Sequence, residues 1–213
     1  FNEALVYVLL ELNDDNDFKN RKIIVADALL QSVISECKIK NYKKIKTFKG
    51  EELKETTCIH PFFDLGYDYD IPMLHARFVT TEQGTGFVHC APSHGPDDFN
   101  LCLNNGIKAI ETVDGDGKYT KHVSLFEGIH IFKANPLVIE KLKEQKKLLS
   151  NGELLHSYPH SWRSKAPLVH RATPQWFISM ESHNLRDKAL KAIDDTTFYP
   201  SKGKERLKSM IET

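Results

Sequence analysis

The sequence lacks any apolar run long enough to cross a bilayer, since its longest uninterrupted run extends only from Ala4 to Leu10. It also lacks a basic leader followed by an apolar segment, so nothing marks the chain for secretion. Lys plus Arg and Asp plus Glu are equal at 29 each, which excludes a global basic field that would draw the protein onto nucleic acid. These absences predict a cytoplasmic protein without membrane attachment, in which any RNA contact comes from a local patch.

Cysteine is scarce, and no two cysteines have the CxxC spacing of a zinc ribbon. Nothing favours a secreted disulfide framework over reduced thiols in the cytosol. The 213 residues suffice for one domain with a sizeable core, or for a domain with an appendage. The chain opens on Phe1 instead of Met and stops within a helical pattern, which indicates a piece of a longer polypeptide.

Hydrophobic patterning predicts a mixture of strands and helices. Leu5 to Leu10 is typical of a strand buried on both faces. Apolar residues at helical spacing predict a helix from Asn20 to Cys37. Further strands are predicted at 71–81, 87–91 and 107–113, and further helices from Pro96, from Asn135, at 185–193 and at 204–211. Because these elements show no regular βαβ spacing, we predict an α+β fold with a curled, mostly antiparallel sheet.

One stretch, Gly84 to Phe99 (GTGFVHCAPSHGPDDF), combines a glycine turn, a short strand, an irregular loop and a helix start. His89 is expected near the strand end and Asp98 in the first helical turn. The helix dipole favours an ionised carboxylate there, so Asp98 is a plausible anchor for a cationic group. The glycines allow close approach of the backbone to another group.

Residue types alone leave three interpretations of this stretch open. In the first, Asp97 or Asp98 caps the helix and His89 is a core histidine. In the second, the stretch provides the Zn²⁺ or Mn²⁺ ligands of a metal hydrolase. In the third, it forms a hydrolytic or binding pocket without metal. The metal ligands would be His89, His94, Asp97 and Asp98, joined by His75. A phosphate loop is excluded, because Gly84-Thr85-Gly86 lacks the Gly-Lys-Ser/Thr ending.

The order of several blocks adds a family resemblance. Gly84 to Phe99 resembles the signature of the editing domain inserted into isoleucyl-tRNA synthetase, which has relatives in the valyl and leucyl enzymes. Further similar blocks, in the family's order, are Phe48 to Leu53, Cys58 to Phe62, His156 to Leu168 (HSYPHSWRSKAPL) and Arg171 to Met180 (RATPQWFISM). The resemblance covers residues 1–213. It implies a β-barrel-like core with peripheral helices in an editing domain at 1–170, and a helical return segment toward the catalytic body at 171–213.

The resemblance also implies a reaction, the hydrolysis of the ester that joins valine to tRNA(Ile), without a metal or other cofactor. Asp98 matches the family carboxylate that holds the substrate α-ammonium group, and His89 matches the histidine that contacts the aminoacyl side chain. Thr85 and Gly86 are expected to shape the pocket wall. A covalent route through Cys90 is disfavoured, because neighbouring strand residues point to opposite faces. The implied partners are the acceptor 3′ end of valyl-tRNA(Ile) and the remainder of the synthetase polypeptide.

Other expectations remain open beside this one. The family carries a threonine-rich strand upstream of the first block, and this chain has no counterpart, nor any HIGH or KMSKS type element. The chain is therefore not expected to activate isoleucine. The alternatives are a valyl-type domain that clears threonyl-tRNA and a non-catalytic module that docks the tRNA 3′ end.

Two local basic stretches are candidates for RNA contact. Trp162, Arg163 and Lys165 form either a packed tryptophan with two solvated cations or a contact with the tRNA acceptor end. The lysines from Lys38 to Lys49 form either a solvated strand face or a phosphate-binding patch.

Overall fold

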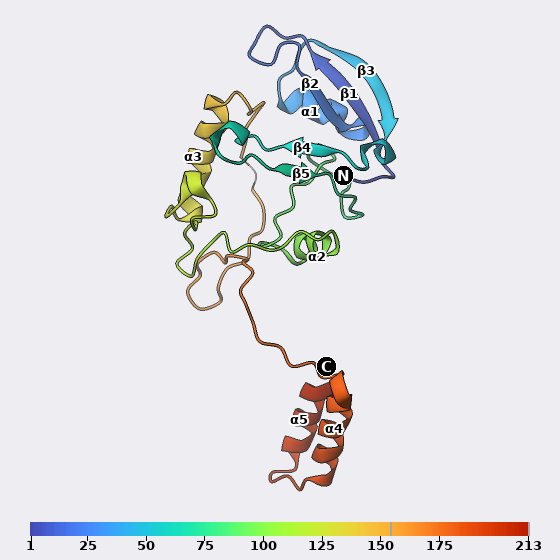
Figure 1. Ribbon diagram of the computed structural model, residues 1–213, viewed down its shortest axis with the longest axis vertical. Coiled ribbons are helices and arrows are strands. Elements are labelled where there is room, and N and C mark those ends of the chain that lie inside the picture. Colours follow the sequence, from blue (N-terminus) through green and yellow to red (C-terminus); the bar gives the residue numbers. More distant parts are fainter. Residues whose placement is uncertain (154, 213) are drawn as a thin grey trace. The chain divides into compact units, whose positions relative to one another are not determined.

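The computed structural model describes residues 1–153 and 155–212 of the chain. Two compact units are present, Phe1–Ala172 and Thr173–Thr213, here called unit 1 and unit 2. Within the described residues, the strands and helices, labelled in Figure 1, are β1 Val6–Leu12, β2 Lys22–Ala26, α1 Leu30–Glu36, β3 Tyr42–Lys49, β4 Thr57–Ile59, β5 Asp70–Pro72, α2 Pro96–Asn104, α3 Ile131–Glu144, α4 Leu185–Asp195 and α5 Lys202–Glu212.

Unit 1 has an antiparallel three-stranded sheet in the order β2-β1-β3 and a two-stranded ribbon of β4 and β5. The predicted α+β class with antiparallel strands is confirmed. Within the described residues the strands close no barrel, so the expected barrel-like core is not confirmed.

The central strand β1 is buried on both faces, as predicted. Tyr7 packs in one cluster with Ala26 and Leu29, while Val8 packs in a second cluster with Leu30 and Val33 of α1. Because β1 exchanges ladder hydrogen bonds with both neighbours, its backbone polar groups are satisfied inside the core. This strand therefore fixes the scaffold against which the later segments pack.

The helix predicted from Asn20 is wrong in its first half. Residues 22–26 form β2, and the helix begins only at Leu30. Asn20 is no helix cap; it has a φ of 63° in the β1–β2 connection, where its N–H donates to the carbonyl of Leu12 (2.7 Å). Pairing with β1 decides the outcome, because Ile23, Ile24 and Val25 are β-branched and fit a sheet edge.

Three predicted strands also need correction. Only the start of 71–81 is a strand, in β5, while 87–91 and 107–113 have no strand structure beyond an isolated bridge between Val113 and Tyr119. The helix predicted from Asn135 begins one turn earlier, at Ile131, and contains Pro136. Its cap is His130, whose Nδ1 accepts from the Phe132 N–H (3.3 Å). Segments 87–91 and 107–113 are therefore held by side-chain and loop contacts instead of by hydrogen bonds between paired strands.

Unit 2 contains the two helices predicted at 185–193 and 204–211, and these helices, α4 and α5, lie side by side as a hairpin (Figure 1). Ile193 is buried, and the Lys204 ammonium bonds the Asp194 carboxylate (3.2 Å). No helix within the described residues has the length and apolar character needed to traverse a bilayer.

Candidate functional site

The glycine turn of the signature is fastened to the central sheet. The Ala26 N–H donates to the Thr85 carbonyl (2.8 Å), and the buried Tyr7 hydroxyl donates to the Gly86 carbonyl (2.8 Å). The Phe87 ring packs on Tyr7 with centroids 4.9 Å apart. Gly86 has a φ of 82°, and a Cβ built on it would lie 2.4 Å from the Cβ of Ala26, so only glycine fits. Gly86 and Phe87 of the signature are therefore packed against the central sheet.

Thr85 also lines an open depression of about 620 Å³. Its other walls are the apolar residues of β2, the inner side of α1 and the segment after α3 (Ile23, Ile24, Val25, Val33, Glu36, Cys37, Leu149, Ser150, Asn151, Gly152 and Glu153). Neither His89 nor Asp98 lines it.

Asp98 lies in the first turn of α2, as the sequence predicts, with Gly95 as the N-cap and Pro96 following it. Its carboxylate folds back over Gly95, where a built Cβ would lie 3.0 Å from Asp98 Oδ2. Within residues 1–153 and 155–212, no Lys, Arg or His side chain forms an ion pair with it. The helix N-terminus stabilises the negative charge of Asp98. Because no cation among the described residues pairs with this carboxylate, it is available to an incoming cation.

Two thiols flank the Asp98 carboxylate. Burial, and then the charge of Asp98, raises the pKa of Cys90 to about 11. Burial and the same charge also raise the pKa of Cys102. Cys90 is therefore protonated at neutral pH and a poor nucleophile, and its S–H donates to the Val88 carbonyl (3.9 Å).

His89 is exposed, and its neighbour His60 was missed by the sequence analysis. Burial, and then the charge of His89, lowers the pKa of His60. The Phe62 N–H donates to His60 Nδ1 (3.0 Å), so the neutral ring carries its proton on Nε2. The ring stacks on Tyr67 with centroids 4.7 Å apart. The block Cys58 to Phe62 was the signal that could have identified it.

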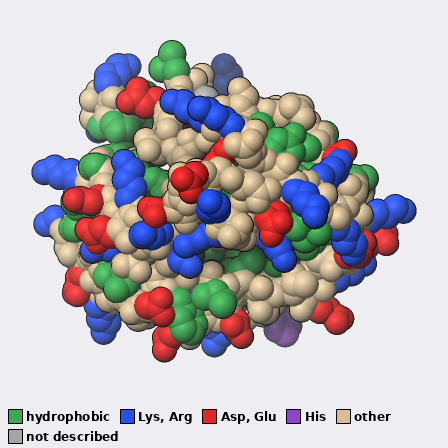
Figure 2. All heavy atoms as spheres, turned by 90° about the horizontal axis from the view of Figure 1, so that it is seen from above, with side chains coloured by type: hydrophobic (Ala, Val, Ile, Leu, Met, Phe, Trp, Pro, Cys, Tyr) green, Lys and Arg blue, Asp and Glu red, His purple; other side chains and the backbone are tan. Residues whose placement is uncertain are grey.

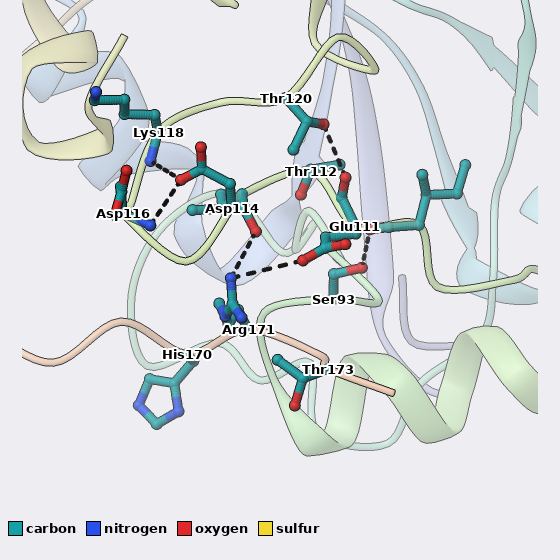
Figure 3. A network of polar contacts seen from close by, with 12 residues as sticks. Ser93, Glu111, Thr112, Asp114, Asp116, Lys118, Thr120, His170, Arg171 and Thr173 are labelled. Atoms are coloured by element: carbon teal, nitrogen blue, oxygen red, sulfur yellow. Dashed lines mark hydrogen bonds and ion pairs between the residues drawn. The ribbon is translucent and has the colours of Figure 1, made fainter. Parts of the chain in front are cut away.

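Ser93, to which the sequence assigned no role, anchors the loop between His89 and α2 (Figure 3). His94, a ligand in the metal interpretation, anchors the same loop. The Ser93 hydroxyl donates to the Ile110 carbonyl (2.5 Å). His94 Nδ1 donates to the His170 carbonyl (2.8 Å), and in the neutral ring Nε2 accepts from the Thr112 hydroxyl (2.7 Å). These contacts join segments far apart in the chain and hold the loop that presents Asp98.

Arg171 closes the same network (Figure 3). Its guanidinium donates to the Val113 carbonyl (3.3 Å) and lies 3.6 Å from the Glu111 carboxylate. The next residue, Ala172, donates its N–H to the Ser93 carbonyl (2.7 Å). The start of the RATPQWFISM block therefore supports the signature loop.

The candidate ligands of the metal interpretation do not converge on one site. Among residues 1–153 and 155–212, no three His, Cys, Asp or Glu side chains converge as a metal site requires. His94 is held by Thr112 and His170, while the His75 Nδ1 accepts from the Glu3 N–H (3.2 Å).

The two basic stretches differ in their pairing. On β3, Lys44 bonds Asp27 (2.8 Å) and Lys46 bonds Glu52 (2.5 Å), so acids neutralise part of that patch. Arg163 and Lys165 have no ion pair among the described residues, and Trp162 is exposed. On the face shown in Figure 2, cationic and anionic side chains are interspersed, in keeping with the neutral total charge.

Comparison with known proteins decides the family. The model of the class I tRNA synthetases (I, L, M and V) matches residues 1–213. The chain belongs to the class I tRNA synthetases.

This synthetase chain is 79% identical over all of its 213 residues to isoleucine–tRNA ligase of Pelagibacter ubique, covering 24% of that protein. It is 43% identical to isoleucine–tRNA ligase of Gluconobacter oxydans, with 98% of the chain and 23% of the relative aligned. The corresponding ligase of Hahella chejuensis is 44% identical over 92% of the chain and 20% of its own length. The synthetase chain thus spans about a quarter of the relatives it matches.

Proposed function

We propose that this segment of a class I synthetase is the editing domain of an isoleucyl-tRNA synthetase, which acts in the cytoplasm and hydrolyses valyl-tRNA(Ile). The observation that carries the proposal is the Asp98 carboxylate, presented by α2 without a cationic partner among the described residues. The signature around it and the isoleucine–tRNA ligase relatives support the choice of substrate. The same proposal includes a barrel-like core and assigns residues 171–213 to a helical segment that returns toward the catalytic body.

The need for such a domain follows from energetics, and isoleucyl-tRNA synthetase is itself the standard example of this argument. Valine and isoleucine differ by one methylene, worth only about 1–3 kcal/mol in an apolar pocket. A first site therefore accepts some valine, and a second, smaller site must remove it. Selection by exclusion requires a pocket that admits valine and rejects the bulkier side chain.

In this proposal Asp98 binds the α-ammonium group of the esterified amino acid. The helix N-terminus stabilises the negative charge of the carboxylate, and the thiol of Cys90 near it is protonated. His89 contacts the aminoacyl side chain, and the neutral ring of His60 adds an Nε2–H donor near it. Water attacks the ester carbonyl, the acyl C–O bond to the terminal ribose breaks, the ribose oxygen takes up a proton from the water, and valine is released. The raised pKa of Cys90 keeps that thiol protonated, which disfavours it as the nucleophile.

Thr85 and Gly86 enter this proposal as a wall held by the sheet. Their effect on catalysis is therefore expected to come through placement of the His89 loop. Trp162, Arg163 and Lys165 are proposed to contact the tRNA acceptor end.

The test measures deacylation of valyl-tRNA(Ile), threonyl-tRNA(Ile) and isoleucyl-tRNA(Ile) by the chain. Asp98→Asn is compared with Asp97→Asn, a neighbouring carboxylate of the same helical turn. Loss of a charge-assisted contact costs about 1.5–3 kcal/mol, so Asp98→Asn should lower kcat/KM for the valyl ester roughly 10- to 150-fold. Asp97→Asn should have little effect. Equal hydrolysis of valyl and isoleucyl esters would refute the size-exclusion role, and preference for the threonyl ester would indicate a valyl-type domain. Binding of the ester without turnover would indicate a docking module.

A further inference from the structure

One segment of this neutral chain contains no lysine or arginine. Between Lys54 and Arg77 there is neither, although the chain has 29 of them in 213 residues. The same segment has acidic side chains at Glu55, Asp64, Asp68 and Asp70. The three aspartates are exposed, and within residues 1–153 and 155–212 no Lys, Arg or His side chain forms an ion pair with them. A local excess of negative charge in a protein without net charge favours contact with a cationic partner.

This segment includes the two-stranded ribbon of β4 and β5 (Figure 1), and residues 57–72 are here called the acidic ribbon. The Met73 N–H donates to the Thr56 carbonyl (3.0 Å), so these two residues form a hydrogen-bonded pair of the ladder. Because such pairs alternate in an antiparallel ladder, the backbone groups of Thr57 and Ile59 face away from β5. Among the described residues β4 has no second strand neighbour, and all of its residues are exposed. The outer edge of β4 is therefore open.

The other strand edges of the described residues are protected against pairing with a further strand. The edge of β2 is tied to the glycine turn through the Ala26 N–H, and β3 has lysines along its length. On β5, Pro72 has no N–H to donate. Covering loops, lysines and prolines are the usual protection of sheet edges. The residues of β4 are Thr57, Cys58 and Ile59, which provide no such protection, so an extended peptide can pair with this edge.

Beside β4, aromatic side chains form a group at the surface. The His60 ring stacks on Tyr67 (4.7 Å between centroids) and is tilted against Tyr69 (5.7 Å). Tyr69 is 53% exposed, and Phe63 is 41% exposed. The Tyr67 hydroxyl is buried and has no hydrogen-bond partner among the described residues, so a polar group of a bound partner would offset the cost of its burial. Exposed rings beside unpaired carboxylates suit ammonium and guanidinium groups, which are attracted to both.

We propose that the acidic ribbon binds an extended segment of another protein that contains arginine or lysine, with the segment paired to the outer edge of β4 and its cations held by Asp68, Asp70 and the ring face of Tyr69. Asp70 is paired with Ile59 in the ladder, so its carboxylate lies two strand spacings, about 10 Å, from an added strand. An arginine and an aspartate side chain together span that distance.

The combination of features favours this partner over the alternatives. Because β4 is only three residues long, backbone pairing alone holds a strand weakly, and the affinity depends on the cations as well. Negative charge disfavours RNA, whose phosphates it repels. Surfaces that remain buried inside one polypeptide are poor in unpaired charge, whereas carboxylates around exposed rings are typical of surfaces that meet a separate partner.

The test measures, by fluorescence anisotropy, how tightly the full chain binds a short labelled peptide that alternates arginine or lysine with valine. In one control peptide glutamate replaces every cation, and in another alternate backbone amides are N-methylated so that they cannot pair with β4. Each control peptide should bind about tenfold more weakly than the basic peptide, because it loses either the charge contacts or the backbone bonds. Affinity for the basic peptide should fall as the salt concentration rises.

Protein variants identify the surface. Asp68→Asn combined with Asp70→Asn should weaken binding about fivefold, since each exposed ion pair contributes little alone. Tyr69→Ala should weaken binding about fivefold, while Tyr69→Phe, which keeps the ring face, should bind nearly as well as the unchanged chain. The matched controls are Asp116→Asn, at an exposed carboxylate without an ion pair among the described residues, and Tyr199→Ala, at a side chain that is 101% exposed in unit 2. Both controls should bind the peptide unchanged.

Equal binding of the basic and glutamate peptides, or of the basic and N-methylated peptides, would overturn the proposal. These peptide controls need no change in the protein, so the test holds even where a variant is unstable. Equal losses in the matched control variants would also overturn it. Binding by the chain that disappears in the full-length synthetase would show that the remainder of the polypeptide covers the acidic ribbon. Binding of single-stranded RNA that depends on Tyr69 would show a nucleic-acid surface instead. Either result refutes a separate basic protein as the partner.

Discussion

Replacement of Gly86 by alanine tests whether the signature turn is a packed part of the sheet. Gly86 has a φ of 82°, and the new Cβ would lie 2.4 Å from the Ala26 Cβ and 3.2 Å from the Ala26 nitrogen. The left-handed conformation costs an L-residue about 1–2 kcal/mol. Forcing a methyl group into packed atoms adds about 1–3 kcal/mol. The smaller entropy of an unfolded chain with alanine returns about 0.5 kcal/mol, so we expect a net loss of roughly 3 kcal/mol.

Gly84 supplies the matched control, because it has a similar φ of 79° and no atom within 4 Å of a built Cβ. Gly84→Ala should therefore cost only the backbone strain, about 1 kcal/mol net. The difference of roughly 2 kcal/mol corresponds to a shift of about 1 M in the urea midpoint for an m-value near 2 kcal/mol/M.

Hydrogen exchange of the β1 and β2 amides in urea measures the stability of unit 1 alone. The Ala26 amide is the most direct probe, because it donates to the Thr85 carbonyl. Equal destabilisation by the two alanines would refute the reasoning, since it would show that the turn does not press against Ala26. A smaller loss for Gly86→Ala than for Gly84→Ala would refute it as well.

Two further predictions concern the loop that presents Asp98. Asp98→Asn should lower the pKa of Cys90, because the substitution removes a negative charge that raises this pKa, and it should therefore speed alkylation of Cys90 by iodoacetamide at pH 9. The exposed Cys58 is the internal control. An unchanged alkylation rate of Cys90 would contradict the placement of the Asp98 carboxylate. His94→Ala removes the bonds to Thr112 and the His170 carbonyl and should cost about 1–2 kcal/mol in urea unfolding, with faster exchange at 110–113. Retained exchange protection there would show that His94 does not hold the loop.

The sequence predicted those features that depend on neighbouring residues. The apolar run at β1 predicts a doubly buried strand, and Pro96 followed by Asp97 and Asp98 predicts a helix start with carboxylates in its first turn. The family follows from blocks whose order is itself a property of the sequence.

Only the tertiary structure decided features in which distant segments compete or meet. Ile23 to Val25 satisfies helical spacing and strand propensity alike, and pairing with β1 selects the strand. The role of His94 depends on Thr112 and on the carbonyl of His170, 18 and 76 residues away. The charge of His89 lowers the pKa of His60, which lies in a separate segment of the chain. Local propensity is encoded over a few residues, whereas such contacts depend on how the whole chain closes, so they cannot be deduced from spacing alone.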